Sequence, residues 1–190
     1  MKPIHTFLCF LMLATFASAG EKQPKPNVVI LLADDLGSKD LGCYGGPVKT
    51  PVLDNLAARG VKFTDFHAGA AVCSPSRATL LTGRQNLRTG IYGVLQDQWH
   101  NMHLLEREVT IAEVLQQAGY GTAHFGKWHI GPENQKKPGT YGIDVISAGA
   151  QGAKKKNTTG RDAPIFDEAI KFMEQQKNGP FYMNVWGHIS

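Results

Sequence analysis

The sequence has no internal repeat and no sustained heptad pattern, which excludes a solenoid and a coiled coil. Its composition is that of an ordinary globular protein, with 42% hydrophobic and 19% charged residues. The length of 190 residues suits one domain or a large part of one. The sequence therefore predicts a compact domain rather than a fibrous or repetitive protein.

No charge of either sign dominates the chain. It has 20 Lys and Arg against 16 Asp and Glu, a formal net charge of +4 at pH 7. The basic residues are scattered, apart from the run Lys154–Lys156. Nucleic-acid binding is therefore not favoured, and the mildly basic balance suits anionic substrates equally well.

A long hydrophobic segment is also lacking. The one apolar run, Ile4 to Phe16, is too short to cross a membrane as a helix. It follows Lys2 and precedes Ala17-Ser18-Ala19, which is the order of a secretory signal peptide and its cleavage site. We therefore expect residues 1–19 to be a signal peptide, so that the protein begins near Gly20 and is secreted or periplasmic. An uncleaved anchor is the less favoured alternative.

Cysteine is scarce, and outside the leader only Cys43 and Cys73 remain. The stretch from Cys73 to Arg84 is typical of a loop that becomes a helix. Ser74 is expected to cap this helix, Pro75 suits its first turn, and Gly83 can end it.

Cys73 would then lie at a helix N-terminus, with Arg77 about one turn later on the same side. Free N–H groups and the helix dipole attract anions there, and the same position lowers the pKa of a thiol. This arrangement predicts a reactive sulfur atom beside a negatively charged substrate. The alternative is a buried structural cysteine before an ordinary helix.

A second candidate site follows Val28–Leu32, which is apolar at every position. Such a run is typical of a strand covered on both faces in a parallel sheet. Asp34 and Asp35 come directly afterwards, at the end where open α/β sheets bind ligands. Two adjacent carboxylates favour a hard divalent cation, Ca²⁺ or Mg²⁺. Taken alone, the pair could equally be a turn with two solvated aspartates.

Helices and strands alternate along the rest of the chain. Helices are expected at 51–59, 110–119 and 163–176, and strands at 61–66, 120–125 and 181–186. The second helix would begin with a capping box at Thr110–Glu113. The first and third helices are amphipathic, with expected apolar faces of Leu53, Leu56 and Ala57, and of Ile165, Phe166, Ala169, Ile170 and Met173. The strand at 120–125 leads into Gly126-Lys127-Trp128-His129. Lys127 and His129 are two residues apart, so both can face one pocket in an extended chain. An ammonium group can bind an anionic oxygen there, and a histidine can move protons near neutral pH.

Three segments together resemble the type I, formylglycine-dependent sulfatases, and the arylsulfatases in particular. They are C-x-P-S-R-x-x-L-L-T-G at 73–83, N-V-V-I-L-L-A-D-D-L-G at 27–37 and G-Y-G-T-A-H-F-G-K-W-H at 119–129. Phe125 is bulkier than the residue usual before this Gly-Lys. The resemblance covers nearly all of residues 26–190. It implies an α/β fold with an alkaline-phosphatase-like core, in which a mostly parallel sheet lies between helix layers.

The resemblance also implies hydrolysis of sulfate esters by a formylglycine that a maturation enzyme makes from a cysteine. The implied site residues are Cys73, Arg77, Lys127 and His129 for catalysis, Lys127 for substrate sulfate, and Asp34, Asp35 and Cys73 for a metal. The implied metal is Ca²⁺, with Mg²⁺ less favoured. The implied substrate is a sulfated small molecule or a sulfated glycan. No disulfide between Cys43 and Cys73 is expected, because a bridge would consume the nucleophile.

Members of this family are much longer and carry further metal ligands. Residues 20–190 are therefore expected to be the N-terminal part of the catalytic domain, truncated and inactive by itself. The sulfate-binding histidine of the family falls either at His188 or just past Ser190. A phosphonate or phosphate monoester hydrolase of the same superfamily is the alternative function, as is an inactive fragment. Asn157-Thr158-Thr159 is a glycosylation acceptor only if the source glycosylates secreted proteins.

Overall fold

The computed structural model describes residues 24–37, 39–95, 103–131, 137–147, 160 and 162–188. The expected signal peptide, Lys154–Lys156 and Asn157 lie outside these residues. None of the described helices is long and apolar enough to cross a membrane.

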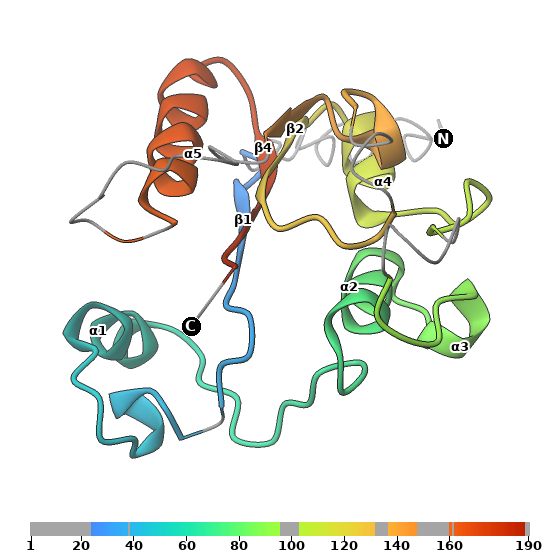
Figure 1. Cartoon of the computed structure of the whole chain (residues 1–190). Coiled ribbons are helices and arrows are strands. Elements are labelled where there is room, and N and C mark those ends of the chain that lie inside the picture. Colours follow the sequence, from blue (N-terminus) through green and yellow to red (C-terminus); the bar gives the residue numbers. More distant parts are fainter. Residues whose placement is uncertain are drawn as a thin grey trace, which may run out of the picture.

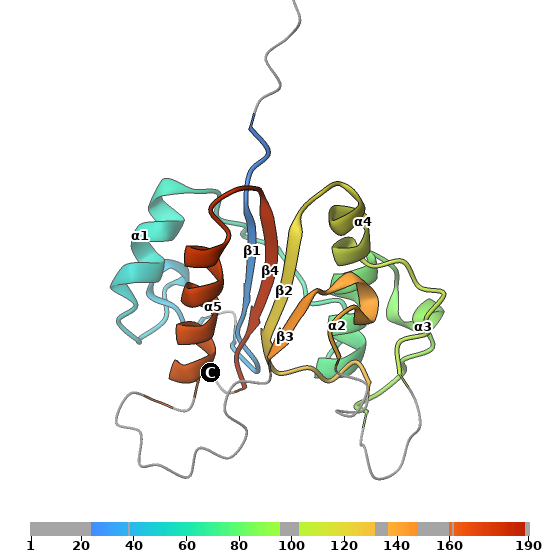
Figure 2. The ribbon, with the colours of Figure 1, turned by 90° about the horizontal axis from the view of Figure 1, so that it is seen from above.

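A four-stranded parallel sheet forms the centre of the fold (Figure 1). Its strands lie in the order β1 (Val28–Leu32), β4 (Phe181–Trp186), β2 (Gly121–Gly126) and β3 (Val145–Ser147). Helices lie on both sides of the sheet (Figure 2), so the expected α/β architecture is confirmed. Among the described strands, the first in the sequence is thus hydrogen-bonded to the last.

The two faces of the sheet pack into two separate cores, because successive side chains of a strand point to opposite faces. Helix α5 (Ala163–Gln175) covers one face, where it buries Phe172 against Phe125 and Phe181 with ring centroids 5.8 Å apart in both pairs. The opposite face carries Tyr182 and Trp186 into a larger core beneath the remaining buried helices. That second core reaches the helix that begins at Cys73.

The other helices are short. They are η1 (Gly42–Tyr44), α1 (Pro51–Arg59), α2 (Cys73–Thr82), α3 (Asn86–Thr89), α4 (Ile111–Gln117) and η3 (Thr140–Gly142). The capping box expected before α4 is present: Thr110 Oγ1 accepts from the Glu113 N–H at 3.1 Å, and the Glu113 carboxylate accepts from the Thr110 N–H at 2.7 Å.

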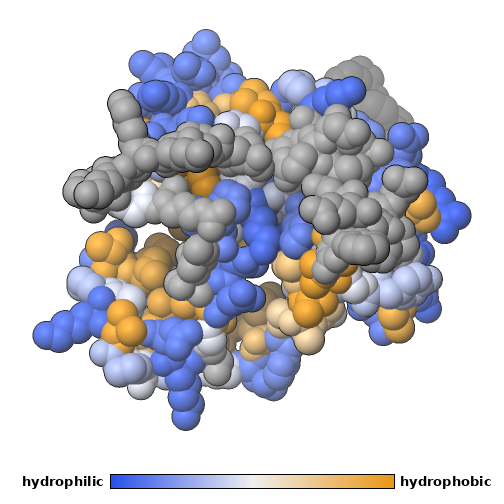
Figure 3. All heavy atoms as spheres, in the orientation of Figure 1, coloured by the Kyte–Doolittle hydropathy of each residue, from blue (hydrophilic) through white to orange (hydrophobic). Residues whose placement is uncertain are grey.

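Three expectations about packing are wrong. Among the described residues, strand β1 is covered on one face only, because Val29 and Leu31 on the other face are 41% and 56% exposed. Residues 61–66 form no strand, and Val61 is 80% exposed. The apolar face expected on α1 is not buried by any described residue. Figure 3 shows exposed apolar side chains over α1 at the lower left of this face.

Candidate active site

The candidate site lies where the parallel strands end. Asp34 and Asp35 follow β1, and Lys127 and His129 follow β2. Strand β4 lies between these two strands and binds both of their ends. The Gly187 N–H donates to the Leu32 carbonyl, and the Lys127 N–H donates to the Trp186 carbonyl, both at 2.9 Å. Segments 93 residues apart are therefore fixed beside one another at the edge where such sheets bind ligands.

Helix α2 brings Cys73 to this edge as its first residue. Gly83 ends the helix in a left-handed conformation, with φ 65°, and its N–H donates to the Thr79 carbonyl at 2.8 Å. The expected cap by Ser74 is wrong: the N-cap residue is Val72, which makes no side-chain capping bond. The Ser74 hydroxyl instead accepts from the Leu95 N–H at 3.0 Å, because the side chain turns into the core rather than back to its own helix.

Asp34 is the electrostatic centre of the site. It is 7% exposed, and its Oδ1 accepts from Arg77 Nη2 at 3.0 Å while its Oδ2 accepts from Lys127 Nζ at 2.5 Å. Burial alone would raise the pKa of this carboxyl, but hydrogen bonds and positive charge from Lys127 and Arg77 lower it below its ordinary value. Asp34 is therefore ionised at neutral pH and joins residues from β1, α2 and the end of β2.

Arg77 is a buried cation with spare hydrogen-bonding capacity. The side chain is 2% exposed, and its guanidinium lies over the Trp186 ring, 4.7 Å from the ring centroid. Among the described residues, its Nε and Nη1 have no hydrogen-bond partner. Burial lowers the pKa of Arg77, although Asp34 opposes this shift. Buried charged donors without an acceptor favour the binding of an anion.

Cys73 and His129 form a second contact in the site. Cys73 Sγ lies 3.0 Å from Nδ1 of His129, which has a left-handed φ of 57° that is uncommon outside glycine. Burial first, and then the positive charges of Lys127 and Arg77, lower the pKa of His129. The imidazole is therefore neutral at pH 7 and can accept a proton from a group at position 73.

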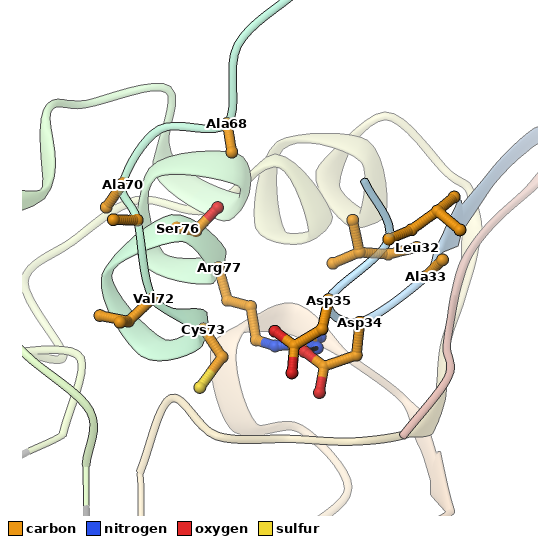
Figure 4. Close-up of a pocket in the computed structure, with 12 residues that line it drawn as sticks. Leu32, Ala33, Asp34, Asp35, Ala68, Ala70, Val72, Cys73, Ser76 and Arg77 are labelled. Carbon is orange, nitrogen blue, oxygen red and sulfur yellow. Dashed lines mark hydrogen bonds and ion pairs between the residues drawn. The ribbon is translucent and has the colours of Figure 1, made fainter. Parts of the chain in front are cut away.

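Asp34, Asp35, Cys73 and Arg77 line a cavity of about 220 Å³ between the end of β1 and the start of α2 (Figure 4). Asp35 is exposed and, like His129, has a left-handed φ, here 58°. Two carboxylates facing a shared cavity have the donor chemistry of a hard divalent cation. Within the described ranges, however, no group of three or more His, Cys, Asp or Glu side chains could hold a metal ion. The described residues therefore supply two carboxylates at this cavity but no complete set of side-chain ligands for a metal ion.

His188 makes different contacts from the other expected site residues. Its backbone N–H donates to Asp162 Oδ2 at 2.8 Å, and its Nδ1 lies 3.1 Å from Asp162 Oδ1. The structure thus joins Asp34 to Arg77 and Lys127. Cys73 contacts His129, whereas His188 contacts Asp162. Sequence reasoning missed Asp162, and the only available signal was its position directly before an amphipathic helix.

Both remaining cysteines are free, and Cys43 lies half-buried in η1, away from the residues that line the cavity. Sequence reasoning also missed Trp186, which supports the Arg77 guanidinium, and Leu95, whose backbone contacts Ser74. Trp186 is the last residue of the predicted strand 181–186, and this position is only a weak indication that its side chain reaches the site. A backbone contact gives none, because every residue except proline has the same N–H and carbonyl.

Comparisons with known proteins agree on one family. The Sulfatase family model matches residues 26–186. Arylsulfatase G of Rattus norvegicus is 47% identical over 137 residues, which cover 68% of this chain and 25% of that protein. Arylsulfatase A of Homo sapiens is 51% identical over 137 residues, which cover 70% of this chain and 27% of that protein. The chain thus spans about a quarter of the length of these curated relatives.

Solved structures show the same likeness in three dimensions. The crystal structure of Ps i-CgsB in complex with k-i-k-neocarrahexaose aligns with a TM-score of 0.75 and 26% identity, over 86% of this chain and 45% of that one. The structure of BT4656 in complex with its substrate D-glucosamine-2-N,6-O-disulfate aligns with a TM-score of 0.68 and 29% identity, over 86% of this chain and 34% of that one.

Proposed function

Because the chain belongs to the sulfatase family, we propose that the full-length protein hydrolyses sulfate esters at the cavity beside Cys73. One observation carries the proposal to particular residues: Cys73 opens helix α2 with its sulfur atom 3.0 Å from the Nδ1 of His129. A nucleophile within hydrogen-bonding reach of a neutral base is the arrangement that covalent catalysis requires.

The proposed nucleophile is made from Cys73. A maturation enzyme would convert this residue to formylglycine, which carries an aldehyde. Water would hydrate the aldehyde, so that position 73 presents a hydroxyl group to the sulfur atom of the sulfate ester. His129 Nδ1 would take a proton from that position, since the ring is neutral at pH 7. The short distance between these two side chains supports a direct transfer.

The other residues would bind and orient the sulfate group. Arg77 offers two buried N–H donors that have no described partner, and Lys127 contributes a second positive charge 2.5 Å from Asp34. Asp34 and Asp35 would hold Ca²⁺, whose positive charge would stabilise negative charge on the sulfate oxygens. Ca²⁺ takes roughly six to eight oxygen ligands, so the remaining ligands would come from other parts of the protein.

The proposed substrate is a sulfated glycan or a smaller sulfate ester. The BT4656 substrate is a sulfated sugar, and the chain's net charge of +4 suits an anion. We also propose export by the signal peptide at residues 1–19, which would give a secreted or periplasmic enzyme.

The test uses the full-length protein, produced in a host with a formylglycine maturation system. We expect mass spectrometry to find the Cys73 peptide converted, and we expect an aryl sulfate to be hydrolysed. Cys73→Ala should abolish turnover, while the matched variant Cys43→Ala should keep it, because Cys43 does not line the cavity. Hydrolysis of an aryl phosphonate or phosphate in preference to the sulfate would favour the alternative function. An active enzyme with a fully alkylatable Cys73 would overturn the proposal.

A further inference from the structure

A buried tryptophan lies against the Arg77 guanidinium and takes no part in the chemistry described above. Trp186 is 0% exposed and is the last residue of β4. The guanidinium lies over its ring, 4.7 Å from the ring centroid, which is within the range of a cation–π contact. Arg77 is among the described residues that line the cavity, and Trp186 is not. Any effect of the ring on an anion in the cavity must therefore pass through its neighbours.

The Trp186 ring is itself held on several sides. Strand β4 lies between β1 and β2, and Trp186 pairs with Leu32 on one side and with Gly126 on the other. Its carbonyl accepts from the Lys127 N–H at 2.9 Å. The His124 ring meets the indole edge to face, with centroids 4.7 Å apart and an interplanar angle of 87°. Paired backbone and a buried neighbouring ring thus fix the indole in one orientation.

Arg77 needs such a support, because hydrogen bonding alone holds its guanidinium weakly in orientation. Its Nη2 donates to Asp34 Oδ1 at 3.0 Å, and among the described residues its Nε and Nη1 have no hydrogen-bond partner. A group held by one hydrogen bond can rotate about that bond. Contact with the Trp186 ring removes this freedom, since the cation is attracted to the face of the ring.

We propose that Trp186 is a positioning residue for Arg77: through its cation–π contact, the ring holds the guanidinium so that Nε and Nη1 are oriented to donate to the sulfate group. Donors that already have a fixed direction lose little freedom when the anion binds, and this raises the affinity. The inference rests on the proposed function, which assigns a sulfate group to Arg77.

The test uses the full-length, matured protein, with inorganic sulfate as the probe because its binding needs no chemical step. Calorimetric titration measures the Kd for sulfate, and aryl sulfate hydrolysis measures KM. Trp186→Leu should raise both by about tenfold, which is the size of effect expected when a buried cation–π contact is lost. Trp186→Phe keeps an aromatic face, and it loses no described hydrogen bond because the indole Nε1 has none. Its Kd should stay within about threefold of the wild-type value.

A double-mutant cycle shows whether the ring acts through Arg77. Arg77→Lys keeps a positive charge near Asp34 but removes the planar set of donors that the ring orients. In that background, Trp186→Leu should have almost no further effect on the Kd for sulfate. An equal effect of Trp186→Leu in both backgrounds would overturn the inference.

Phe181→Leu is the matched control for general loosening of the core. Phe181 is 5% exposed, lies at the other end of β4, and packs against Phe172 with ring centroids 5.8 Å apart. This variant loses a buried ring from the same strand, but not the ring beside Arg77, so it should keep the wild-type Kd. Wild-type affinity in Trp186→Leu, or an equal loss in Phe181→Leu, would contradict the inference.

A second measurement covers the case in which Trp186→Leu does not fold. Fluorinated tryptophans introduced at position 186 by nonsense suppression keep the shape of the side chain and reduce the negative charge on the face of its ring. The Kd for sulfate should rise with the number of fluorine atoms, and a Kd that does not change would overturn the inference. A wild-type protein that binds no sulfate would overturn it as well. A wild-type protein that binds sulfate but hydrolyses no sulfate ester would overturn only the proposed function.

Discussion

Replacing Asp34 by asparagine removes the charge that both Arg77 and Lys127 contact. Asparagine keeps one acceptor oxygen, but an amide nitrogen replaces the second oxygen, and this nitrogen donates hydrogen bonds and cannot accept them. The Lys127 side chain is 19% exposed and can turn toward water, whereas Arg77 is 2% exposed and cannot. The cost is therefore mainly that of a buried, uncompensated guanidinium. Removing one partner of a buried ion pair costs about 3–5 kcal/mol, and the lower end applies here.

We therefore expect Asp34→Asn to lower the free energy of unfolding by about 3 kcal/mol in EDTA, a change of about 10²-fold in the unfolding equilibrium constant. Denaturant unfolding of the full-length protein in EDTA measures the change. The same variant should bind Ca²⁺ more weakly in calorimetric titration, because one anionic ligand is lost.

Asp35→Asn is the matched control. Asp35 is exposed, whereas Asp34 is 7% exposed. The Asp35 variant should therefore weaken Ca²⁺ binding but leave the stability in EDTA close to that of the wild type. Equal stability of the Asp34 variant and the wild type in EDTA would refute the reasoning about the buried ion pair. Unchanged Ca²⁺ affinity in both variants would show that these carboxylates are not the metal ligands.

Four further outcomes are expected. Lowering the pH should destabilise the protein through Asp34, whose pKa in the folded protein lies below the ordinary 3.8. Its contribution to the free energy of unfolding is complete above that pH and is lost as the pH falls through the folded pKa. The unfolding free energies of the wild type and Asp34→Asn should therefore converge in acid. Phe172→Ala should cost about 3–5 kcal/mol in denaturant unfolding, since the ring is 4% exposed between Phe125 and Phe181, and an unchanged midpoint would contradict that packing. Thr110→Ala should lower the free energy of unfolding by about 2 kcal/mol, because it removes both the capping box and the buried hydrogen bond that Thr110 Oγ1 donates to the Tyr141 carbonyl at 2.8 Å, and an unchanged unfolding midpoint would contradict both contacts. The 190-residue chain expressed alone should not hydrolyse an aryl sulfate, because its described residues hold only part of a metal ligand set, and turnover by that chain would contradict this.

Local sequence signals predicted several elements well. The capping box placed the start of α4, and the apolar periodicity of 163–176 placed α5 within one residue. The buried set on α5 differs, since Phe172 is buried while Phe166 and Ile170 are each 47% exposed. A period identifies a helix, but the layer that packs against it decides which side chains along the apolar stripe are covered.

Features that depend on distant partners were not predictable. The all-apolar run of β1 indicated a strand with two covered faces, yet Val29 and Leu31 on one face are 41% and 56% exposed. Nor did it indicate that β4 would be its one neighbour among the described strands. Strand order is decided by pairings between segments far apart in the sequence, which no local window contains. Ser74 illustrates the same limit, because its hydroxyl could bind its own helix or a remote backbone, and it binds the remote one.

The sequence indicated the residues of the candidate site but not which of their side chains contact one another. Asp34 and Lys127 were expected separately, one for a metal and one for an anion, and the structure joins them directly. Their roles as site residues remain predictions. Leu95 could not have been found, since its contribution comes from the main chain and not from its side chain.

The pairing of β1 with β4 has a consequence for how the chain folds during synthesis. Asn27 Oδ1 accepts from the Phe181 N–H across 154 residues, so β1 can meet its neighbour only after the residues up to β4 have also been synthesised. Until then the apolar side chains of β1 are exposed to solvent, which favours aggregation of the unfinished chain and its binding by chaperones. Contacts of such long range also slow folding, because a long loop must close before they form. Asp34 follows β1 directly, so it can reach Arg77 and Lys127 in their final arrangement only when that strand docks. The candidate cavity beside Asp34 would therefore be completed only when β1 and β4 have paired.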